Sequence, residues 1–293
     1  MLILISDSFD STLPGILAKY GDVTSDKTRL PDATVVLIRS KTKVTKEYID
    51  SAPKLKLVIR GGVGLDNVDQ VYAKSKNIMV FNTAEASTIA VAELAFALMI
   101  ALPNQITRAD ASMREGKWIK SEIHRTELMG KTLGILGMGR IGLALAFRAQ
   151  AFRMRVLGWH PDVYFTDFAE IIPTLEETVA VSDYVSLHMP LVPSTKGLID
   201  KKALACFKDG AYVINTGRGQ CVVEEDMVEA LKSGKIGGYA TDVWYSDPPQ
   251  NSPLIGAPNC IFTPHIGAET KENMIRIGTI IDRLIAEHKD KLS

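Results

Sequence analysis

Short apolar runs alternate with longer helical stretches along the whole chain. Most of these runs are continuous in Val, Ile and Leu, with no polar residue at alternate positions. Strands that are covered by helices on both faces have this pattern, and strands that alternate with helices build α/β folds. The expected strands cover residues 2–5, 35–38, 57–59, 132–136, 155–158, 184–187, 211–215 and 238–243.

The longest apolar stretch, residues 88–102, predicts a buried helix. It contains Glu93, stops at Pro103 and is shorter than the roughly 20 residues that a membrane span needs. The apolar start of the chain is too short for a signal peptide, because Ser6 and Asp7 follow at once. We therefore expect no membrane partner.

Composition narrows the class of protein. The 293 residues include 34 Lys and Arg and 34 Asp and Glu, so the net charge is zero, and 46% are hydrophobic. These values exclude a disordered chain and argue against a protein that binds nucleic acid or anionic lipid through bulk charge. Cys206, Cys221 and Cys260 are widely spaced. They predict neither disulfides nor a metal site, which favours a cytoplasmic location.

A glycine motif, Gly137-x-Gly139-x-x-Gly142, follows the expected strand 132–136 and precedes a helical stretch at 143–152. Its glycines permit a tight turn, close approach of a pyrophosphate to the backbone, and packing of the helix on the strand. This context favours a dinucleotide site over a merely tight turn. The α/β chain ahead of the motif predicts a separate first unit, and the final helix, 271–289, is expected to return to it.

The next strand ends at His160, where dinucleotide sites usually carry an acidic residue that binds the adenosine ribose. No carboxylate at this position repels a 2′-phosphate, and no Arg follows to bind one. The pattern therefore leaves both NAD and NADP open as cofactors. The alternative for His160 is a surface loop residue without a ligand contact.

Three glycine-containing segments in the second half of the chain each carry one ionisable residue that is a candidate for catalysis. They are residues 213–219, 240–248 and 262–268. Arg218 offers a two-pronged match for a carboxylate substrate. His265 is an acid–base group suited to neutral pH, and the carboxylate of Asp247 beside it favours the imidazolium. Taken singly, each has a structural alternative: a surface Arg, a helix cap or a buried His. Their joint occurrence after a dinucleotide motif favours catalysis.

In these motifs the chain resembles the D-isomer-specific 2-hydroxyacid dehydrogenases, and most closely their D-3-phosphoglycerate dehydrogenase branch. The resemblance extends from about residue 33 to about residue 285. It is carried by residues 38–45, 60–69, 91–93, 137–142, 187–190, 215–219 and 263–267.

The resemblance implies two doubly wound parallel-sheet α/β domains with a cleft between them. A discontinuous, flavodoxin-like substrate domain would comprise residues 1–97 and 268–293, and a Rossmann dinucleotide-binding domain residues 98–267. It also implies a homodimer that acts on a small-molecule substrate with NAD.

The resemblance assigns roles to individual residues. It implies catalytic roles for Arg218, which would anchor the substrate carboxylate, for Asp247, and for the acid–base His265. Substrate contacts are implied for the Gly62, Val63 and Gly64 loop, for Arg39 and Arg60, which match phosphate-contacting positions, and for Arg218. The alternative for Arg39 and Arg60 is a solvated loop charge. Cofactor contacts are implied for Gly137, Met138, Gly139, Arg140, Ile141, Gly142, His160, His188, Pro190, Thr216, Asp242, His265 and Gly267.

Two departures from the family qualify this expectation. Asp247 stands where the family has Glu, so a small backbone shift is expected to bring it to His265. Because the sequence ends at Ser293, the C-terminal regulatory domains that some phosphoglycerate dehydrogenases carry, and serine feedback through them, are not expected. Formate dehydrogenases are similar around residues 238–244 but carry Gln at position 247.

The expected reaction interconverts a D-2-hydroxy acid and its 2-keto acid, with 3-phosphoglycerate as first choice. If the protein is an enzyme, the alternative activity is that of a glyoxylate or hydroxypyruvate reductase. If it is not an enzyme, the alternative is an NAD-sensing binding protein.

Overall fold

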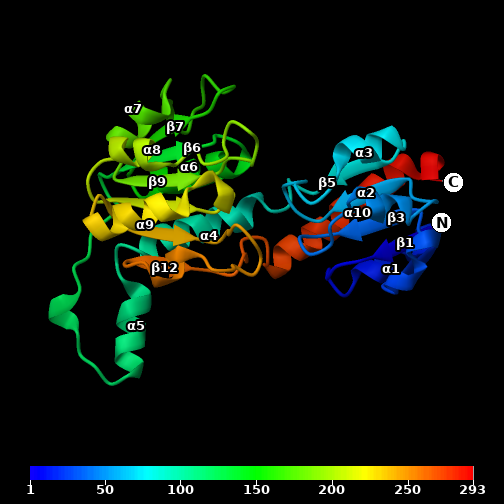
Figure 1. The fold of residues 1–293 in the computed structure, drawn as a ribbon, viewed down its shortest axis with the longest axis horizontal. Coiled ribbons are helices and arrows are strands. Elements are labelled where there is room, and N and C mark those ends of the chain that lie inside the picture. Colours follow the sequence, from blue (N-terminus) through cyan, green and yellow to red (C-terminus); the bar gives the residue numbers. More distant parts are fainter. Residues whose placement is uncertain (293) are drawn as a thin grey trace. The chain divides into compact units, whose positions relative to one another are not determined.

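The structure is a computed structural model that describes residues 1–292. The chain forms two compact units. Unit 1 consists of Met1–Ala90 and the residues from Ala268 onward, and unit 2 of Val91–Gly267. The boundary falls inside helix α4 (Thr88–Ala101), whose later residues pack in the core of unit 2. Both units are parallel-sheet α/β folds, which confirms the fold class that the apolar runs predicted (Figure 1).

Unit 1 contains a five-stranded parallel sheet in the order β2-β1-β3-β4-β5, the order of flavodoxin-like folds. Its strands are β1 (Leu2–Ile5), β2 (Asp22–Thr24), β3 (Val35–Ile38), β4 (Leu57–Arg60) and β5 (Met79–Asn82). Its helices are α1 (Leu13–Leu17), α2 (Lys46–Asp50), α3 (Gln70–Ser75) and α10 (Lys271–Leu292), with 3-10 turns at Ala18–Tyr20 and Lys27–Asp32.

The apolar runs of unit 1 supply two cores, because successive side chains of a strand point to opposite faces. On one face Leu2, Leu4 and Val36 pack with residues of α2 and α3. On the other face Ile3 and Val35 pack with residues of α1 and α10. The final helix therefore belongs to unit 1, where it lies along the sheet (Figure 1).

Unit 2 contains a seven-stranded parallel sheet in the order β12-β11-β10-β9-β6-β7-β8. The strand order reverses at β6, which pairs with β7 on one side and β9 on the other, and such a switch point is where open α/β sheets bind ligands. Its strands are β6 (Thr132–Leu136), β7 (Arg155–Trp159), β8 (Glu170–Ile171), β9 (Tyr184–Leu187), β10 (Ala211–Asn215), β11 (Ile236–Thr241) and β12 (Cys260–Phe262).

Helices cover both faces of the sheet in unit 2. Residues of α4 and α6 pack on one face, and residues of α7, α8 and α9 on the other. Besides α4, the helices are α5 (Ile106–Arg114), α6 (Arg140–Ala151), α7 (Leu175–Ala180), α8 (Lys201–Cys206) and α9 (Glu224–Ser233), with 3-10 turns at Lys120–Glu122, Gly219–Cys221 and Pro253–Gly256. Figure 1 shows α5 projecting from the body of unit 2 as an arm.

The structure contains all eight expected strands and corrects several bounds. The strand expected at 238–243 is β11, which begins at Ile236 and ends at Thr241. The helix after the glycine motif begins at Arg140 rather than at residue 143, because Gly139 already serves as its N-cap. Four short strands, β2, β5, β8 and β12, were not expected.

No single helix among residues 1–292 has the length and apolar character to cross a membrane. The pair α4 and α5, bent by 67°, meets the criteria only when its two helices are taken together. Four side chains of α4, Ala92, Ala95, Leu98 and Met99, are buried in a core of unit 2.

Candidate active site

The turn between β6 and α6 has the tight geometry that its glycines require. Gly137 adopts a φ of 106°, and a Cβ there would lie 2.8 Å from the backbone of His188. A Cβ on Gly142 would lie 2.3 Å from the carbonyl oxygen of Gly137. Side chains at these two positions would push the helix off the strand. The side chain of Met138 is buried in the core at 1% exposure, so only its backbone faces the turn.

The same turn leaves room for an anion. A Cβ on Gly139 would meet nothing within 4 Å, and Gly139 caps α6 without a side-chain hydrogen bond. The first N–H groups of a helix have no partner within it, and the helix dipole favours negative charge there. Arg140 and Ile141 are the first residues of α6. This open, uncapped turn fits the pyrophosphate of a dinucleotide.

Polar side chains follow the neighbouring strands at the same edge of the sheet. His188 comes directly after β9, and its ring lies 2.9 Å from Ser186 Oγ and 3.4 Å from Thr216 Oγ1, at the end of β10. Burial lowers the pKa of His188 from 6.5 to about 4, so its ring is neutral. Pro190 accepts a hydrogen bond from Thr195 through its carbonyl oxygen.

His160 follows β7 at this edge. Its Nδ1 accepts a hydrogen bond of 3.0 Å from the N–H of Asp162, so a neutral ring carries its hydrogen on Nε2. The imidazole thus makes the local contact that an Asp side chain makes in an Asx turn. Asp162 itself is exposed.

Asp242, after β11, holds the loop that carries His265. One carboxylate oxygen accepts from Thr263 Oγ1 at 2.6 Å and from the N–H of Ile266 at 2.8 Å, and the other accepts from the N–H of Gly267 at 2.8 Å. Asp242 is 2% exposed. Charge-assisted bonds of this kind are strong. The anchoring of the loop by Asp242 is a contact that the sequence did not reveal.

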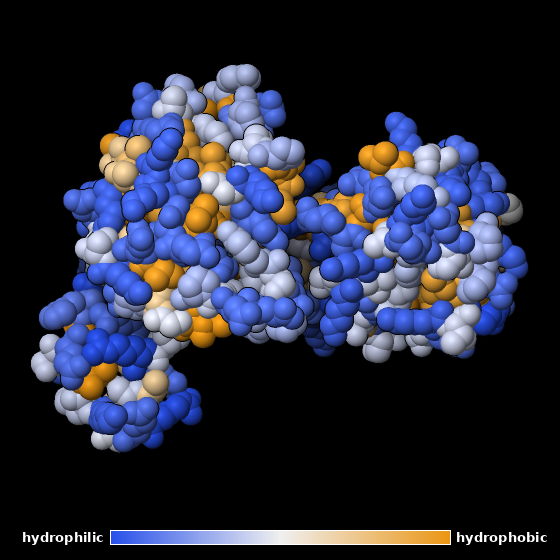
Figure 2. All heavy atoms as spheres, in the orientation of Figure 1, coloured by the Kyte–Doolittle hydropathy of each residue, from blue (hydrophilic) through white to orange (hydrophobic). Residues whose placement is uncertain are grey.

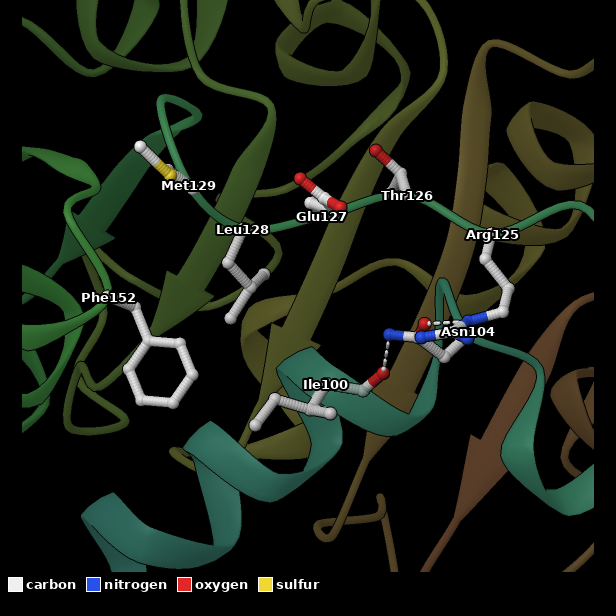
Figure 3. A pocket seen from close by; sticks show the side chains of 8 residues that line it. All are labelled: Ile100, Asn104, Arg125, Thr126, Glu127, Leu128, Met129 and Phe152. Carbon is white, nitrogen blue, oxygen red and sulfur yellow. Dashed lines mark hydrogen bonds between the residues drawn. The ribbon is translucent and has the colours of Figure 1, made fainter.

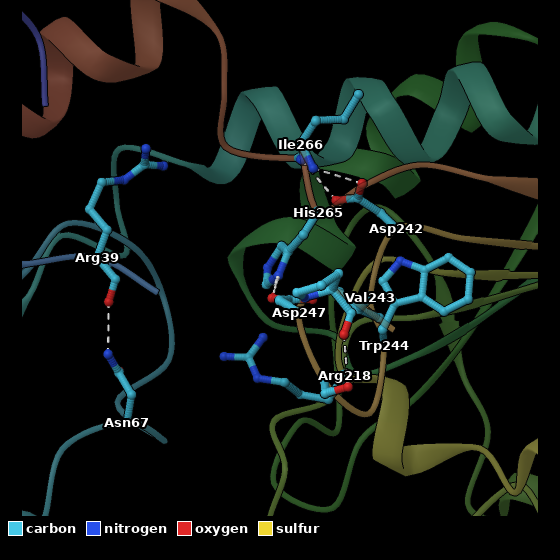
Figure 4. Close-up of polar contacts among 12 residues, drawn as sticks. Arg39, Asn67, Arg218, Asp242, Val243, Trp244, Asp247, His265 and Ile266 are labelled. Carbon is cyan, nitrogen blue, oxygen red and sulfur yellow. Dashed lines mark hydrogen bonds and ion pairs between the residues drawn. The ribbon is translucent and has the colours of Figure 1, made fainter. Parts of the chain in front are cut away.

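His265 and Asp247 form a pair at the carboxyl edge of the sheet (Figure 4). His265 Nδ1 lies 2.5 Å from Asp247 Oδ2. Such a contact orients the ring and leaves Nε2 available to a substrate. The φ of His265 is 57°, a conformation that residues other than Gly rarely adopt and that persists only where the surroundings impose it. Here the anchored loop imposes it.

Arg218 lies in the loop after β10, where Asn215 holds the backbone. Asn215 Nδ2 donates to the carbonyl oxygen of Arg218 at 3.0 Å, and Asn215 Oδ1 accepts from the N–H of Gly217 at 3.0 Å. Figure 4 shows the Arg218 side chain extending beside the His265–Asp247 pair. Unit 2 therefore brings together the three catalytic candidates. The positioning role of Asn215, which is fully buried, was also not anticipated.

The Gly62–Gly64 loop follows β4 at the carboxyl edge of the sheet in unit 1. The N–H of Gly62 donates to Thr83 Oγ1 at 3.0 Å, whereas the N–H groups of Val63 and Gly64 have no acceptor among the described residues. The guanidinium of Arg60 donates to the carbonyl oxygen of Gly64. Arg60 thus braces this loop.

Arg39, after β3, is paired with an acid of its own unit. Its guanidinium contacts both carboxylate oxygens of Glu269. The sequence placed Arg39 at the substrate and gave no sign of Glu269. Among the described residues, no three His, Cys, Asp or Glu side chains are grouped as metal ligands.

Comparison with known proteins agrees with this geometry. Residues 96–267 match the NAD binding domain of the D-isomer specific 2-hydroxyacid dehydrogenases. The chain is 40% identical over 262 residues to hydroxypyruvate reductase of Thermotoga maritima, covering 88% of this chain and 86% of that protein. The chain belongs to the D-isomer specific 2-hydroxyacid dehydrogenase family, and the matched domain is that family's NAD binding domain.

Within that family the chain is similar to phosphoglycerate dehydrogenases. It is 39% identical over 291 residues to D-3-phosphoglycerate dehydrogenase of Methanocaldococcus jannaschii, covering 95% of this chain. The chain spans 56% of the length of that enzyme and 54% of the length of the rat enzyme.

Solved structures of the family share the fold. A formate dehydrogenase from Staphylococcus aureus in complex with NAD has a TM-score of 0.88 at 29% identity, covering 100% of this chain and 96% of that one. A D-lactate dehydrogenase from Aquifex aeolicus complexed with NAD and lactic acid has a TM-score of 0.88 at 27% identity, covering 100% and 97%.

Proposed function

We propose that the chain is an NAD-dependent dehydrogenase that interconverts D-2-hydroxy acids and 2-keto acids. The observation that carries this proposal is the His265–Asp247 contact of 2.5 Å at the same sheet edge as the dinucleotide turn. An imidazole held by a carboxylate is an acid–base group, and hydride transfer to or from a carbon that bears oxygen needs one.

In this proposal each residue has a defined task. Nε2 of His265 takes the proton from the substrate hydroxyl during oxidation and returns it to the carbonyl oxygen during reduction. Asp247 keeps the ring oriented through its contact with Nδ1. Arg218 binds the substrate carboxylate, which fixes the reacting carbon relative to His265. A bound nicotinamide supplies the hydride chemistry.

The dinucleotide contacts are part of the same proposal. The turn from Gly137 to Gly142 would hold the pyrophosphate, and His160 would face the adenosine ribose. His188, Thr216 and Asp242 follow neighbouring strands toward the reacting centre, with Pro190 and Gly267 in the adjoining loops. NAD is the expected cofactor. His160 brings no carboxylate against a 2′-phosphate, so we expect NADP to be a weaker alternative.

Two substrates are candidates. The first pair is 3-phosphoglycerate and 3-phosphohydroxypyruvate. It is supported by the resemblance at Arg39 and Arg60 and by the similarity to phosphoglycerate dehydrogenases. This substrate pair would place the chain in serine biosynthesis. Hydroxypyruvate or glyoxylate is supported by a relative that the chain covers over 86% of its length and by the pairing of Arg39 with Glu269. The roles of Val63 and Gly64 toward the substrate are supported by their two N–H groups without an acceptor, whereas the N–H of Gly62 is already bonded to Thr83.

The experiment that tests the proposed function is a panel of 2-keto acids assayed with NADH and with NADPH in parallel. We expect turnover of at least one hydroxypyruvate-type acid, with NADH preferred. A chain that binds NADH tightly but reduces no keto acid would be an NAD-sensing binding protein instead, because binding requires only the dinucleotide turn.

A homodimer completes the proposal. Several large apolar side chains are exposed on the arm around α5, and apolar atoms lie among hydrophilic ones there (Figure 2, lower left). They are Ile106, Met113, Trp118 and Met129, with exposures of 50%, 56%, 77% and 60%. Exposed apolar surface of this kind marks interfaces. A nearby pocket of about 270 Å³ has a mixed lining of Ile100, Asn104, Arg125, Thr126, Glu127, Leu128, Met129 and Phe152 (Figure 3).

Sedimentation equilibrium of the parent and of Trp118→Glu tests the homodimer. We expect a dimer that the substitution weakens.

A cytoplasmic location is part of the proposal. The cysteine content favours it, because cysteines without disulfide partners suit a reducing compartment, and Cys206 is exposed.

A further inference from the structure

The guanidinium of Arg39 forms a two-pronged receptor for an anion, and the chain fills it with its own carboxylate. Nη1 of Arg39 lies 3.1 Å from Oε2 of Glu269, and Nη2 contacts Oε1. The Arg39 side chain is 14% exposed and that of Glu269 is 45% exposed. Bidentate pairing with Arg is the geometry that a carboxylate or phosphate ligand would use. An external anion at Arg39 must therefore displace Glu269.

A second carboxylate is close to the same arginine. Asp7, after β1, accepts hydrogen bonds from the N–H of Arg39 at 2.6 Å and from the N–H and hydroxyl of Thr42. Asp7 is fixed by three hydrogen bonds, so it cannot move away from an incoming anion at low cost. Asp7 thus lies against the main chain of Arg39, whereas Glu269 occupies its guanidinium.

The neighbouring cation is engaged in holding backbone. The Arg60 guanidinium donates to the carbonyl oxygens of Gly64 and Arg39, the latter at 3.4 Å, and the Asn67 amide also donates to the carbonyl oxygen of Arg39 at 2.7 Å. Figure 4 shows the contact between Arg39 and Asn67. These bonds fix the loops on which both arginines lie, at the sheet edge where open α/β folds bind ligands.

We propose that Glu269 is a specificity-determining residue, which makes the chain discriminate against 2-keto acids that bear a phosphate and favours those with a neutral substituent. The proposal rests on the proposed function. A phosphate would have to replace the Arg39–Glu269 ion pair and then lie near the displaced carboxylate of Glu269, and like charges at close range oppose binding. A hydroxymethyl group or a hydrogen atom leaves the Arg39–Glu269 pair in place.

The substitution Glu269→Gln tests this inference, because it removes the charge and keeps the shape. The control is Glu272→Gln, which removes an exposed acid in the first turn of α10. For each variant kcat/KM would be measured with NADH for hydroxypyruvate and for 3-phosphohydroxypyruvate. Binding of D-3-phosphoglycerate to the whole chain would be measured by calorimetry without cofactor.

We expect the parent to prefer hydroxypyruvate by about tenfold or more, since the like charges oppose phosphate. Glu269→Gln should raise kcat/KM for 3-phosphohydroxypyruvate about tenfold, leave hydroxypyruvate unchanged, and tighten phosphoglycerate binding. Glu272→Gln should change none of these. In Glu269→Gln/Arg39→Gln the gain should disappear, because the uncovered guanidinium is lost.

Two results would overturn the inference. The first is a parent with equal kcat/KM for hydroxypyruvate and 3-phosphohydroxypyruvate. The second is a Glu269→Gln variant in which kcat/KM changes by the same factor for both substrates. If the parent reduces no keto acid, the proposed function fails, and calorimetry still decides the role of Glu269. Tighter phosphoglycerate binding by Glu269→Gln then supports that role, and unchanged binding refutes it.

Discussion

Nδ1 of His265 and Oδ2 of Asp247 lie 2.5 Å apart, so the shorter acid reaches the ring that a Glu serves elsewhere in the family. The loop that carries His265 is held in place. Asp242 binds the 263–267 segment to the end of β11 through three hydrogen bonds. The contact between Asp247 and His265 thus forms against a fixed partner.

The contact between Asp247 and His265 should matter for turnover. The carboxylate holds Nδ1 of the ring, so Nε2 is the nitrogen that can meet the substrate. In Asp247→Ala this contact is lost, so kcat for keto-acid reduction should fall while NADH binding stays unchanged. The measurements are kcat and NADH fluorescence for both proteins. An unchanged kcat would mean that Asp247 is not needed to position the ring.

Loss of the imidazole should affect chemistry and spare cofactor binding. His265→Ala is expected to lower kcat by about 10²–10⁴-fold, the usual contribution of a general acid or base. NADH binding, followed by fluorescence, should stay within about twofold, because the dinucleotide turn is formed by other residues. Near-normal turnover would assign the acid–base role elsewhere.

Two glycines of the dinucleotide turn should respond differently to the same change. Gly142→Ala places a Cβ 2.3 Å from the carbonyl oxygen of Gly137, which should destabilise the fold by about 1–3 kcal/mol. Gly139→Ala meets nothing within 4 Å, so unfolding in urea should be unchanged while NADH affinity falls. Each variant is the control for the other. Unaltered NADH affinity in Gly139→Ala would remove the pyrophosphate from this turn.

The choice between NAD and NADP should depend on position 160. His160→Asp adds a carboxylate that repels a 2′-phosphate, so the ratio of kcat/KM for NADH over NADPH should rise about tenfold, roughly 1.4 kcal/mol. Asp162→Asn is the matched control. If Asp162→Asn changes the ratio of kcat/KM for NADH over NADPH and His160→Asp does not, then Asp162 is the residue that contacts the ribose.

The half-buried ring of His188, with its lowered pKa, should make the fold sensitive to acid. Its pKa is about 4 in the folded chain against 6.5 for an exposed His, so between these values the unfolded chain binds the proton more strongly. Stability therefore falls as the pH drops from about 6.5 toward 4. The free energy of unfolding, measured with urea, should drop between pH 7 and pH 4.5 by about 2 kcal/mol less in His188→Gln than in the parent. Equal losses would show that His188 takes up a proton as readily in the folded state.

The strands that could be predicted are those buried on both faces. In β3 and β9 every residue is buried, so a continuous apolar run marks them. The strands that were not predicted are short and only partly buried, as in Asp22–Thr24 and Glu170–Ile171. All four unpredicted strands are edge strands of their sheets, where a partly exposed segment can pair without a continuous apolar run.

The candidate site shows a similar division. Residues that carry chemistry stand in recognisable motifs, as Arg218 and His265 do. Residues that act through a partner do not, because the partner is distant in the sequence: Arg39 and Glu269 are 230 positions apart. No local pattern marks Glu269 as an acid that meets an arginine, and only the folded chain brings them together.

Helix α10 completes the second core of unit 1 with Ile277, Ile281, Ile285 and Leu292, although the remaining buried residues of that core lie in the first 90 positions. During translation the ribosome must therefore synthesise all of unit 2 before the last part of this core emerges. At about 5–20 residues per second, the apolar face of β1, β3 and β4 waits on the order of ten seconds or more without its cover. Over this interval unit 2 can fold first, and the early half of unit 1 is the part of the nascent chain that would need a chaperone.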